Sequence, residues 1–215
     1  MNFTRLILLL VIITNLLLFE ARGQTADSIM VKANYGSKNE EIKMLMRIDH
    51  VDYYKVTFQN KKFKGSPYLH FTTKEYLKGI LVKKDTLFSP AFAKEYLKFK
   101  NVDSTAVLSL VTKPKGDSVT FFYSLLGVEF SKNYKRMVRE DYSLRDGLVT
   151  NESYKNIPTN STLPIFVYSL PYEDPRQPGY KFYCALTAEG ISPEKWWEKY
   201  KVEHYIIVEL RIVSK

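Results

Sequence analysis

The sequence predicts an α+β fold that is mainly antiparallel β-sheet with two or three short helices packed on it. Two observations lead to this class. Apolar and polar residues alternate over much of the chain, which is typical of strands with one buried face. Strands and helices do not follow one another in the regular alternation that a parallel, doubly wound sheet requires. We therefore expect an antiparallel sheet that carries a few helices.

Nine segments have the alternation or the β-branched and aromatic content of strands. They are residues 42–48, 54–58, 68–71, 80–82, 106–112, 119–126, 164–170, 181–187 and 205–213. The turn-forming run at 113–117 makes residues 106–126 the clearest hairpin. A turn at 49–52 is expected to join the first two segments into another hairpin. The last segment, 205–213, is apolar on both faces, so we expect it to be central in its sheet.

Two helices have clear start signals, in which serine is the N-cap and proline is the first helical residue. Ser89-Pro90 precedes the first helix, at 91–98, and Ser192-Pro193 precedes the second, at 195–201. A third helix, without such a start, is expected at 132–140. These helices would lie on the sheet.

Residues 1–23 have the layout of a cleavable secretory signal. Arg5 supplies the positive charge, residues 6–18 are almost entirely apolar, and Ala21 and Gly23 place small residues at the cleavage site. The apolar run is too short to span a bilayer. We expect cleavage after Gly23, secretion or export to the periplasm, and no transmembrane segment in the mature chain.

Residues 24–215 are expected to form a single α+β domain, since this length suffices for a core of its own. The segment 141–162 is rich in Asn, Ser, Asp and Thr and is predicted to be a loop, within which a division into two lobes would fall. Triplets that begin at Asn151 and Asn160 fit the acceptor pattern for N-glycosylation, although such triplets often arise by chance.

Cys184 is the single cysteine, so burial rather than an intramolecular disulfide must hold the fold together. A lone thiol could be a catalytic nucleophile. However, Cys184 alternates with Phe182 and Leu186 on one face of a predicted strand. This pattern favours a buried, unreactive thiol.

The motifs of the common enzyme classes are absent from the chain. The Asp-His-Val-Asp run at 49–52 has metal-binding side chains, but not at the spacing of a known metal motif, and a solvated turn explains it. The acidic pairs at 140–141 and 173–174 could serve a glycosidase, but the sequence does not give the separation of two carboxyl groups. We assign no catalytic residue, no metal site and no cofactor.

The formal net charge of +9 at pH 7 points to an anionic partner. Only eight of the 32 basic residues are arginine, which is the residue suited to bidentate recognition of phosphate. The excess of lysine, together with the predicted export, argues against a nucleic acid. The expected partner is an anionic glycan, a lipid headgroup or a protein at the cell envelope.

Aromatic residues gather near the C-terminal end of the chain. Trp196 and Trp197 lie on the second predicted helix, and Tyr172 and Tyr180 flank a loop that contains two prolines. Adjacent helical residues point about 100° apart, so one tryptophan should be buried and the other half-exposed. These four residues and the lysines beside them are the candidate ligand-binding site. The alternative is that the helix lies across the sheet and its aromatic residues seal the core.

Three functions are compatible with these features. The preferred hypothesis is an exported soluble protein without enzymatic activity that binds a ligand or partner at the envelope. A secreted hydrolase acting on glycan or peptide would need an open cleft containing Cys184 or two carboxyl groups. A structural subunit of an envelope assembly would instead use an exposed strand edge to pair with another chain.

Overall fold

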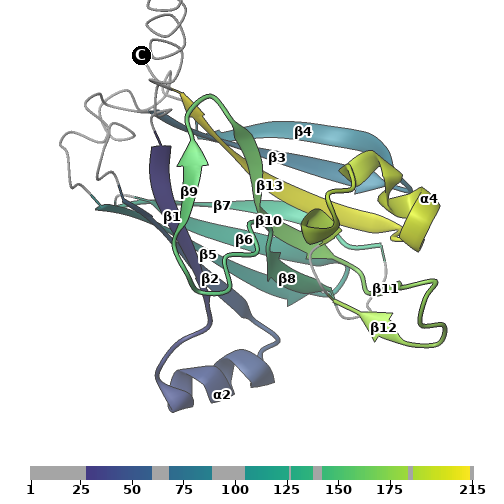
Figure 1. The fold of residues 1–215 in the computed structure, drawn as a ribbon. Coiled ribbons are helices and arrows are strands. Elements are labelled where there is room, and N and C mark those ends of the chain that lie inside the picture. Colours follow the sequence, from purple (N-terminus) through teal and green to yellow (C-terminus); the bar gives the residue numbers. More distant parts are fainter. Residues whose placement is uncertain are drawn as a thin grey trace, which may run out of the picture.

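The computed structural model describes residues 28–59, 68–88, 105–125, 127–137, 142–183 and 186–213. The predicted signal at 1–23, the helix expected at 91–98 and Cys184 lie outside the described residues. Within them, two antiparallel sheets pack face to face, and short helical segments lie on the outer face of one sheet (Figure 1). A further helix projects from one end of the molecule (Figure 1).

The first sheet has six strands. In spatial order they are β7 (Val128–Lys135), β6 (Ser118–Leu125), β5 (Thr105–Lys115), β2 (Asp52–Gln59), β1 (Ser28–Tyr35) and β9 (Lys155–Pro158). β5 and β6 form the predicted hairpin, in which Lys115 pairs with Ser118 and Gly116 adopts the left-handed conformation at φ 61°.

The second sheet has five strands and is joined by a separate two-stranded ribbon. In spatial order its strands are β4 (Ile80–Phe88), β3 (Tyr68–Leu77), β13 (His204–Val213), β10 (Thr162–Ser169) and β8 (Ser143–Asp146); the ribbon pairs β11 (Tyr172–Glu173) with β12 (Lys181–Phe182). β13 is central and largely buried on both faces, as its sequence predicted.

The main core lies between the two sheets. It consists of the apolar side chains that point inward at alternate positions along the strands. It includes Val31, Val56, Leu108 and Phe121 from the first sheet, and Phe71, Phe166, Ile206 and Leu210 from the second. Each of these side chains is almost completely removed from water. Burial of apolar surface at about 25 cal/mol per Å² is therefore the main stabilising contribution.

A second core lies on the outer face of the five-stranded sheet. It is covered by the 3-10 helices η1 (Leu186–Glu189) and η2 (Pro193–Lys195) and by α4 (Trp196–Tyr200). Trp196 packs 4.9 Å from the ring of Tyr205, and its indole N–H donates to the carbonyl of Ile191 at 3.0 Å. Trp196 is 1% exposed, whereas Trp197 is half-buried, so the expected division between adjacent tryptophans is confirmed.

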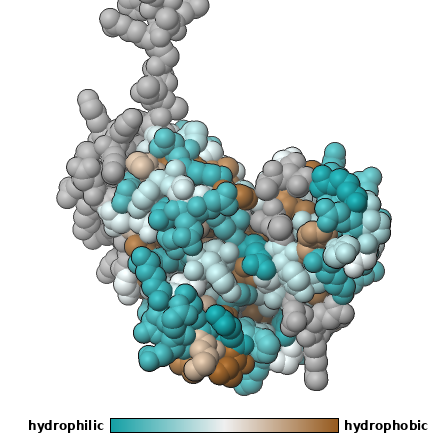
Figure 2. Space-filling view, turned by 60° about the horizontal axis from the view of Figure 1, so that its bottom comes forward, coloured by the Kyte–Doolittle hydropathy of each residue, from teal (hydrophilic) through white to brown (hydrophobic). Residues whose placement is uncertain are grey.

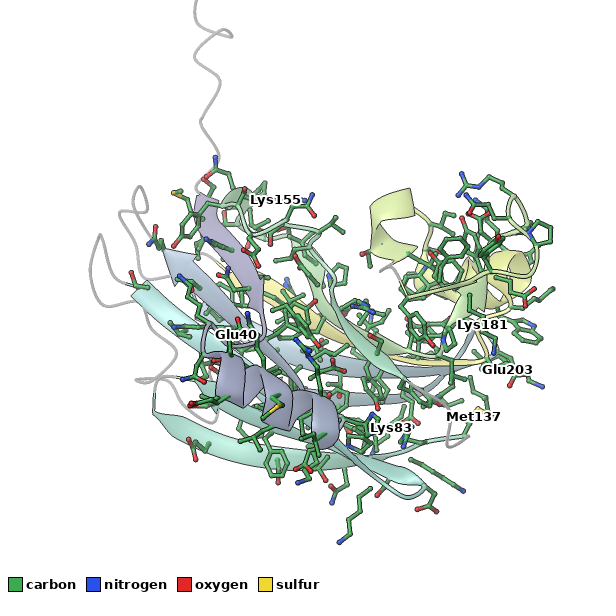
Figure 3. The ribbon with its side chains drawn as sticks, turned by 90° about the horizontal axis from the view of Figure 1, so that it is seen from below. Glu40, Lys83, Met137, Lys155, Lys181 and Glu203 are labelled. Atoms are coloured by element: carbon green, nitrogen blue, oxygen red, sulfur yellow. The ribbon has the colours of Figure 1, made fainter. Side chains whose placement is uncertain are left out.

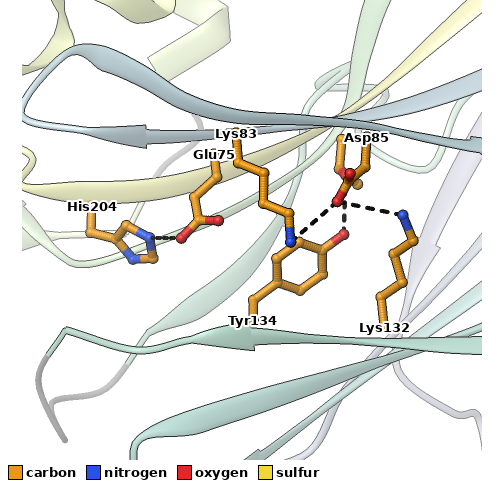
Figure 4. Close-up of polar contacts among 7 residues, drawn as sticks. Glu75, Lys83, Asp85, Lys132, Tyr134 and His204 are labelled. Atoms are coloured by element: carbon orange, nitrogen blue, oxygen red, sulfur yellow. Dashed lines mark hydrogen bonds and ion pairs between the residues drawn. The ribbon is translucent and has the colours of Figure 1, made fainter.

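The strand edges β4 and β7 face one another along one side of the two sheets and are linked by polar contacts (Figure 4). Asp85 of β4 lies 3.4 Å from Lys83 and 3.5 Å from Lys132 of β7. Tyr134 of β7 donates to the hydroxyl of Thr73 on β3 at 3.1 Å. Exposed ion pairs contribute only about 0–1 kcal/mol each. Their lysines also disfavour pairing of these edges with another chain.

The strand predicted at 42–48 is wrong, because this segment is the helix α2 (Glu40–Ile48). The side chain of Asn39 caps the helix by accepting from the backbone N–H of Ile42 at 3.0 Å. Short apolar runs fit both periods, and Leu45 breaks the strict alternation that a strand requires. Strands nevertheless far outweigh helices in the described residues, so the fold is richer in antiparallel sheet than a balanced α+β fold. None of the residues of α2 is buried, so this helix does not pack on a sheet as predicted.

Three other predictions differ from the structure, two in the type of element and one in its length. Residues 132–135 belong to β7 rather than to a helix, since their apolar and polar positions alternate along an edge strand. The segment 141–162, predicted to be a loop, contains β8 and β9. The strand predicted at 181–187 is shorter, because β12 ends at Phe182 and a 3-10 helix begins at Leu186. None of the described helices is long and apolar enough to cross a membrane.

Replacing the buried tryptophan should cost far more stability than replacing its neighbour. We expect Trp196→Ala to lower the free energy of unfolding by about 3–5 kcal/mol, because it leaves a cavity between α4 and β13. Trp197→Ala should cost about 1 kcal/mol, since it removes only exposed contacts with Lys78 and Lys201. Urea unfolding of both variants measures the difference, and equal losses would contradict the packing described here.

Candidate functional site

A pocket of about 400 Å³ opens between α2 and the adjoining end of the two sheets. Figure 3 views the molecule from this side, with Glu40 marking the start of α2. Cationic and aromatic side chains dominate its lining. They are Lys43, Arg47 and Arg136 together with Tyr35, Tyr142 and Tyr168; Asp52 is the one carboxylate, and His50 also contributes.

Tyr142 is held in the pocket wall by a chain of buried hydrogen bonds. Its hydroxyl accepts from the backbone N–H of Met137 at 3.2 Å and bonds to Nδ1 of His204 at 2.7 Å. The other ring nitrogen of His204 lies 3.0 Å from the carboxylate of Glu75 (Figure 4). The tautomer with its proton on Nε2, assigned from this network, lets Tyr142 donate to His204 and His204 donate to Glu75.

The ring of Tyr142 also positions the buried arginine of the pocket. It stacks on Tyr168 at 4.9 Å, with 10° between the planes, and the guanidinium of Arg136 lies 5.3 Å from its centroid. Arg136 is 8% exposed, and its Nη1 donates to the carbonyl of Gly116 in the β5–β6 turn at 3.3 Å. Burial raises the pKa of Tyr142 to about 12, so its hydroxyl stays protonated at neutral pH.

Asp52 is the first residue of β2 and is engaged within the protein through both carboxylate oxygens. Oδ1 accepts from the hydroxyl of Tyr35 at 2.9 Å, and Oδ2 accepts from the backbone N–H of Leu144 at 3.0 Å. Burial raises its pKa, against the opposing effect of these bonds and of the Arg145 charge. The solvated turn predicted at 49–52 is therefore wrong for Asp52, although Asp49 and His50 are exposed.

Three cationic side chains face one carboxylate in this pocket, so its lining is positive. Sequence reasoning missed this arrangement, because its members come from distant segments. His204 is 129 residues from Glu75 and 62 residues from Tyr142. Arg136 follows β7 and Arg47 lies on a helix that the sequence pattern did not predict. Only the general expectation of an anionic partner pointed in this direction.

The aromatic residues selected from the sequence are not gathered in one place. Trp196 is the first residue of α4, and its ring is buried against Tyr205 of β13. A ligand cannot contact this ring, so Trp196 has a packing role. Tyr172 packs on Tyr200 at 5.3 Å, and Trp197 lies between the ammonium groups of Lys78 and Lys201, 5.4 Å from each.

Tyr172 lines a second pocket of about 410 Å³ together with three lysines, Lys181, Lys199 and Lys201. Neither Trp197 nor Tyr180 lines it, and Tyr180 is 69% exposed. Of the four selected residues, Tyr172 is therefore the one that shares a pocket with cationic side chains.

The metal ligands and the acidic pairs considered from the sequence can be checked in the described residues. Among them, no group of three or more His, Cys, Asp or Glu side chains is placed to hold a metal ion. Asp174 is paired with Arg176, and hydrogen bonds from that residue lower the pKa of Asp174 to about 2. Such a carboxyl group is ionised at neutral pH and cannot act as a general acid. The acidic pair at 140–141 lies outside the described residues.

The fold and the pocket together define a two-sheet β protein with a cationic, tyrosine-lined pocket at one end. Comparison of the chain with models of protein families, with curated proteins and with solved structures finds no match in any of the three. The function of the pocket must therefore be inferred from its own chemistry.

The raised pKa of Asp52 predicts a specific dependence of stability on pH. The folded protein holds this proton to a higher pH than the unfolded chain does, so this group's contribution to the free energy of unfolding falls as pH rises through the raised pKa. Asp52→Asn lacks the effect and keeps an acceptor oxygen. Its stability relative to the wild type should rise with pH, by about 1.4 kcal/mol for each unit by which the pKa is raised.

Urea unfolding over the acidic to neutral range tests this expectation. Glu152→Gln, at an exposed position, controls for the loss of a carboxylate. A relative stability of Asp52→Asn that stays flat or falls as pH rises would show that the carboxylate is not disfavoured by burial.

Removing the hydroxyl of Tyr142 should destabilise the pocket wall. Tyr142→Phe leaves Nδ1 of buried His204 and the N–H of Met137 without this partner, at an expected cost of about 1–3 kcal/mol in the free energy of unfolding. Tyr154→Phe, at a position 40% exposed, is the matched control and should change stability by less than about 0.5 kcal/mol. Equal effects in chemical denaturation would mean that the buried chain of hydrogen bonds contributes nothing.

Proposed function

We propose that this chain is an exported, non-enzymatic binding protein that takes an anionic ligand in the pocket between α2 and the sheets. The observation that carries the proposal is the charge of the lining, in which Lys43, Arg47 and Arg136 face a single carboxylate. That carboxylate already accepts two hydrogen bonds from the protein. A phosphate or carboxylate group on the ligand would therefore complement the pocket.

The cationic side chains differ in ways that suit recognition. Arg136 is buried and held against the ring of Tyr142, so it presents a planar cation in a fixed position. Arg47 and the half-buried Lys43 lie on α2 at the rim. Charges at a rim mainly raise the rate of association, whereas a fixed buried cation sets affinity and orientation. The stacked rings of Tyr142 and Tyr168 add an apolar surface for the carbon skeleton of the ligand.

The secretory layout of residues 1–23 supports a ligand found in the envelope or the medium. Anionic glycans and lipid headgroups both carry the required charge there, and a nucleic acid is not expected in that compartment.

The same geometry is unfavourable for catalysis by Tyr142. Glu75, His204 and Tyr142 have the order of an acid, a base and a nucleophile. However, burial raises the pKa of the Tyr142 hydroxyl to about 12, and its oxygen already accepts from the N–H of Met137. The acid–histidine–tyrosine chain thus supports a role in holding the pocket wall.

Calorimetric titration with sn-glycerol 3-phosphate tests the proposal, with uncharged glycerol as the control ligand. Arg47→Gln should weaken binding about tenfold, because it removes a charge-assisted contact from an exposed residue without disturbing the core. Arg136→Gln should weaken it further, provided that its unfolding curve shows a folded protein. Lys84→Gln, at an exposed position on β4, should bind like the wild type.

Two results would contradict this assignment. Equal binding of glycerol and glycerol phosphate would show that the charge of the ligand does not contribute to binding. A loss of binding in Tyr172→Ala, with none in Arg47→Gln, would move the site to the second pocket beside α4.

A further inference from the structure

The helix α2 exposes apolar side chains that nothing in the described structure covers. None of its nine residues is buried. Ile42, Met44, Leu45 and Ile48 are 48%, 58%, 62% and 66% exposed. In Figure 1 the helix stands clear of both sheets, and in Figure 2, which turns this end forward, apolar side chains lie beside strongly hydrophilic ones at the lower edge.

The orientation of α2 is the reverse of that of a helix that covers a protein core. Lys43 and Arg47, which are four residues apart and share one side of the helix, line the pocket. Met46 also lines the pocket, whereas Ile42, Met44, Leu45 and Ile48 occupy the rest of the circumference and are exposed. The helix therefore presents a cationic side to the pocket and an apolar side to its surroundings.

The surroundings of α2 are basic. Two of the three acidic residues at its ends are paired, Glu40 with Lys43 at 2.6 Å and Asp49 with Lys113 at 3.0 Å; the third is Glu41. The second pair joins the helix to the tip of the β5–β6 hairpin, where Lys115 is also exposed. An exposed apolar stripe flanked by cationic side chains matches the boundary between the headgroups and the acyl chains of an anionic membrane.

We propose that α2 docks on an anionic lipid surface, with Ile42, Met44, Leu45 and Ile48 entering the headgroup boundary and the pocket mouth receiving a lipid phosphate. The ligand part of this inference rests on the proposed function. At 1.5 Å per residue the helix is about 14 Å long, so it lies in the interface and does not span it.

The exposed area favours a membrane over a second copy of the chain. Four residues that are each about half to two-thirds exposed make a small apolar patch, whereas a stable protein interface buries roughly 800 Å² per partner. Insertion into a fluid interface requires neither that area nor a complementary surface. The net charge of +9 adds a long-range attraction to anionic lipid.

Glu41 provides a sharp test of this orientation. It lies four residues before Leu45 and seven before Ile48, so it shares their side of the helix. A carboxylate there opposes both insertion and approach to anionic lipid. Glu41→Gln should therefore strengthen binding to phosphatidylglycerol vesicles.

Co-sedimentation of the exported chain, purified after removal of the signal, with phosphatidylglycerol vesicles measures the docking. Pure phosphatidylcholine vesicles are the control for charge. The double variant Leu45→Ser/Ile48→Ser should bind about tenfold more weakly or worse, because two apolar side chains no longer enter the interface. Ile80→Ser/Val82→Ser, which changes two equally exposed apolar residues on β4, should bind like the wild type.

The outcomes separate docking from ligand binding. Wild-type protein that binds glycerol phosphate but not vesicles would overturn the docking and leave a free anion as the ligand. Vesicle binding that depends on Leu45 and Ile48, without binding of glycerol phosphate, would support docking and overturn the proposed function. Equal vesicle binding by the two double variants, or a dimer in solution that only the α2 variant dissociates, would overturn the docking.

Discussion

Phe121 of β6 meets Tyr168 of β10 edge to face at 5.3 Å, in the space where the two sheets pack together. Two further aromatic pairs cross the same space, Phe58 with Phe71 at 6.2 Å and Tyr54 with Phe166 at 5.7 Å. A chain with one cysteine cannot form an intramolecular disulfide, so this packing must supply the stability. This packing sets the positions of the strand edges β4 and β7, of the pocket beside α2 and of the helix α4.

The pocket beside α2 lies at the end of this core, where polar side chains replace apolar ones. Tyr168 belongs to both regions, since one contact of its ring is with Phe121 and another is a stack on Tyr142. Beyond Tyr142, the buried His204 and the carboxylate of Glu75 bring polar groups between the sheets, and each is satisfied by a neighbour. The core thereby fixes one wall of the pocket, whereas the other wall is formed by α2 through Lys43, Met46 and Arg47.

The positive charge of the sequence and the positive lining of the end pocket agree in sign, but the sequence did not indicate where that lining would form. The excess of positive charge indicated an anionic partner, but the clustering of aromatic residues pointed to Trp196 and Tyr172 rather than to the end pocket. Arginine was set aside because lysine is more abundant, yet the pocket uses Arg47 and Arg136. Abundance describes the average surface, whereas a site depends on the few residues that the fold brings together.

Local pattern alone was enough for the β5–β6 hairpin, the central strand β13, a short helix within 195–201 and the burial of one of two adjacent tryptophans, because turn residues and alternation act over a few residues. The predicted cap was wrong, since the side chain of Ser192 makes no capping hydrogen bond and a 3-10 turn precedes α4. Residues 42–48 were mistaken for a strand, since a short apolar run fits both the helical and the strand period. The absence of a neighbouring strand to pair with distinguishes the two, and the sequence does not show it. The contact of His204 with Glu75, and the exposure of the apolar side of α2, were decided by tertiary structure. Both depend on which segments, distant in the sequence, the packed sheets bring into contact. A short-range sequence pattern does not contain this information.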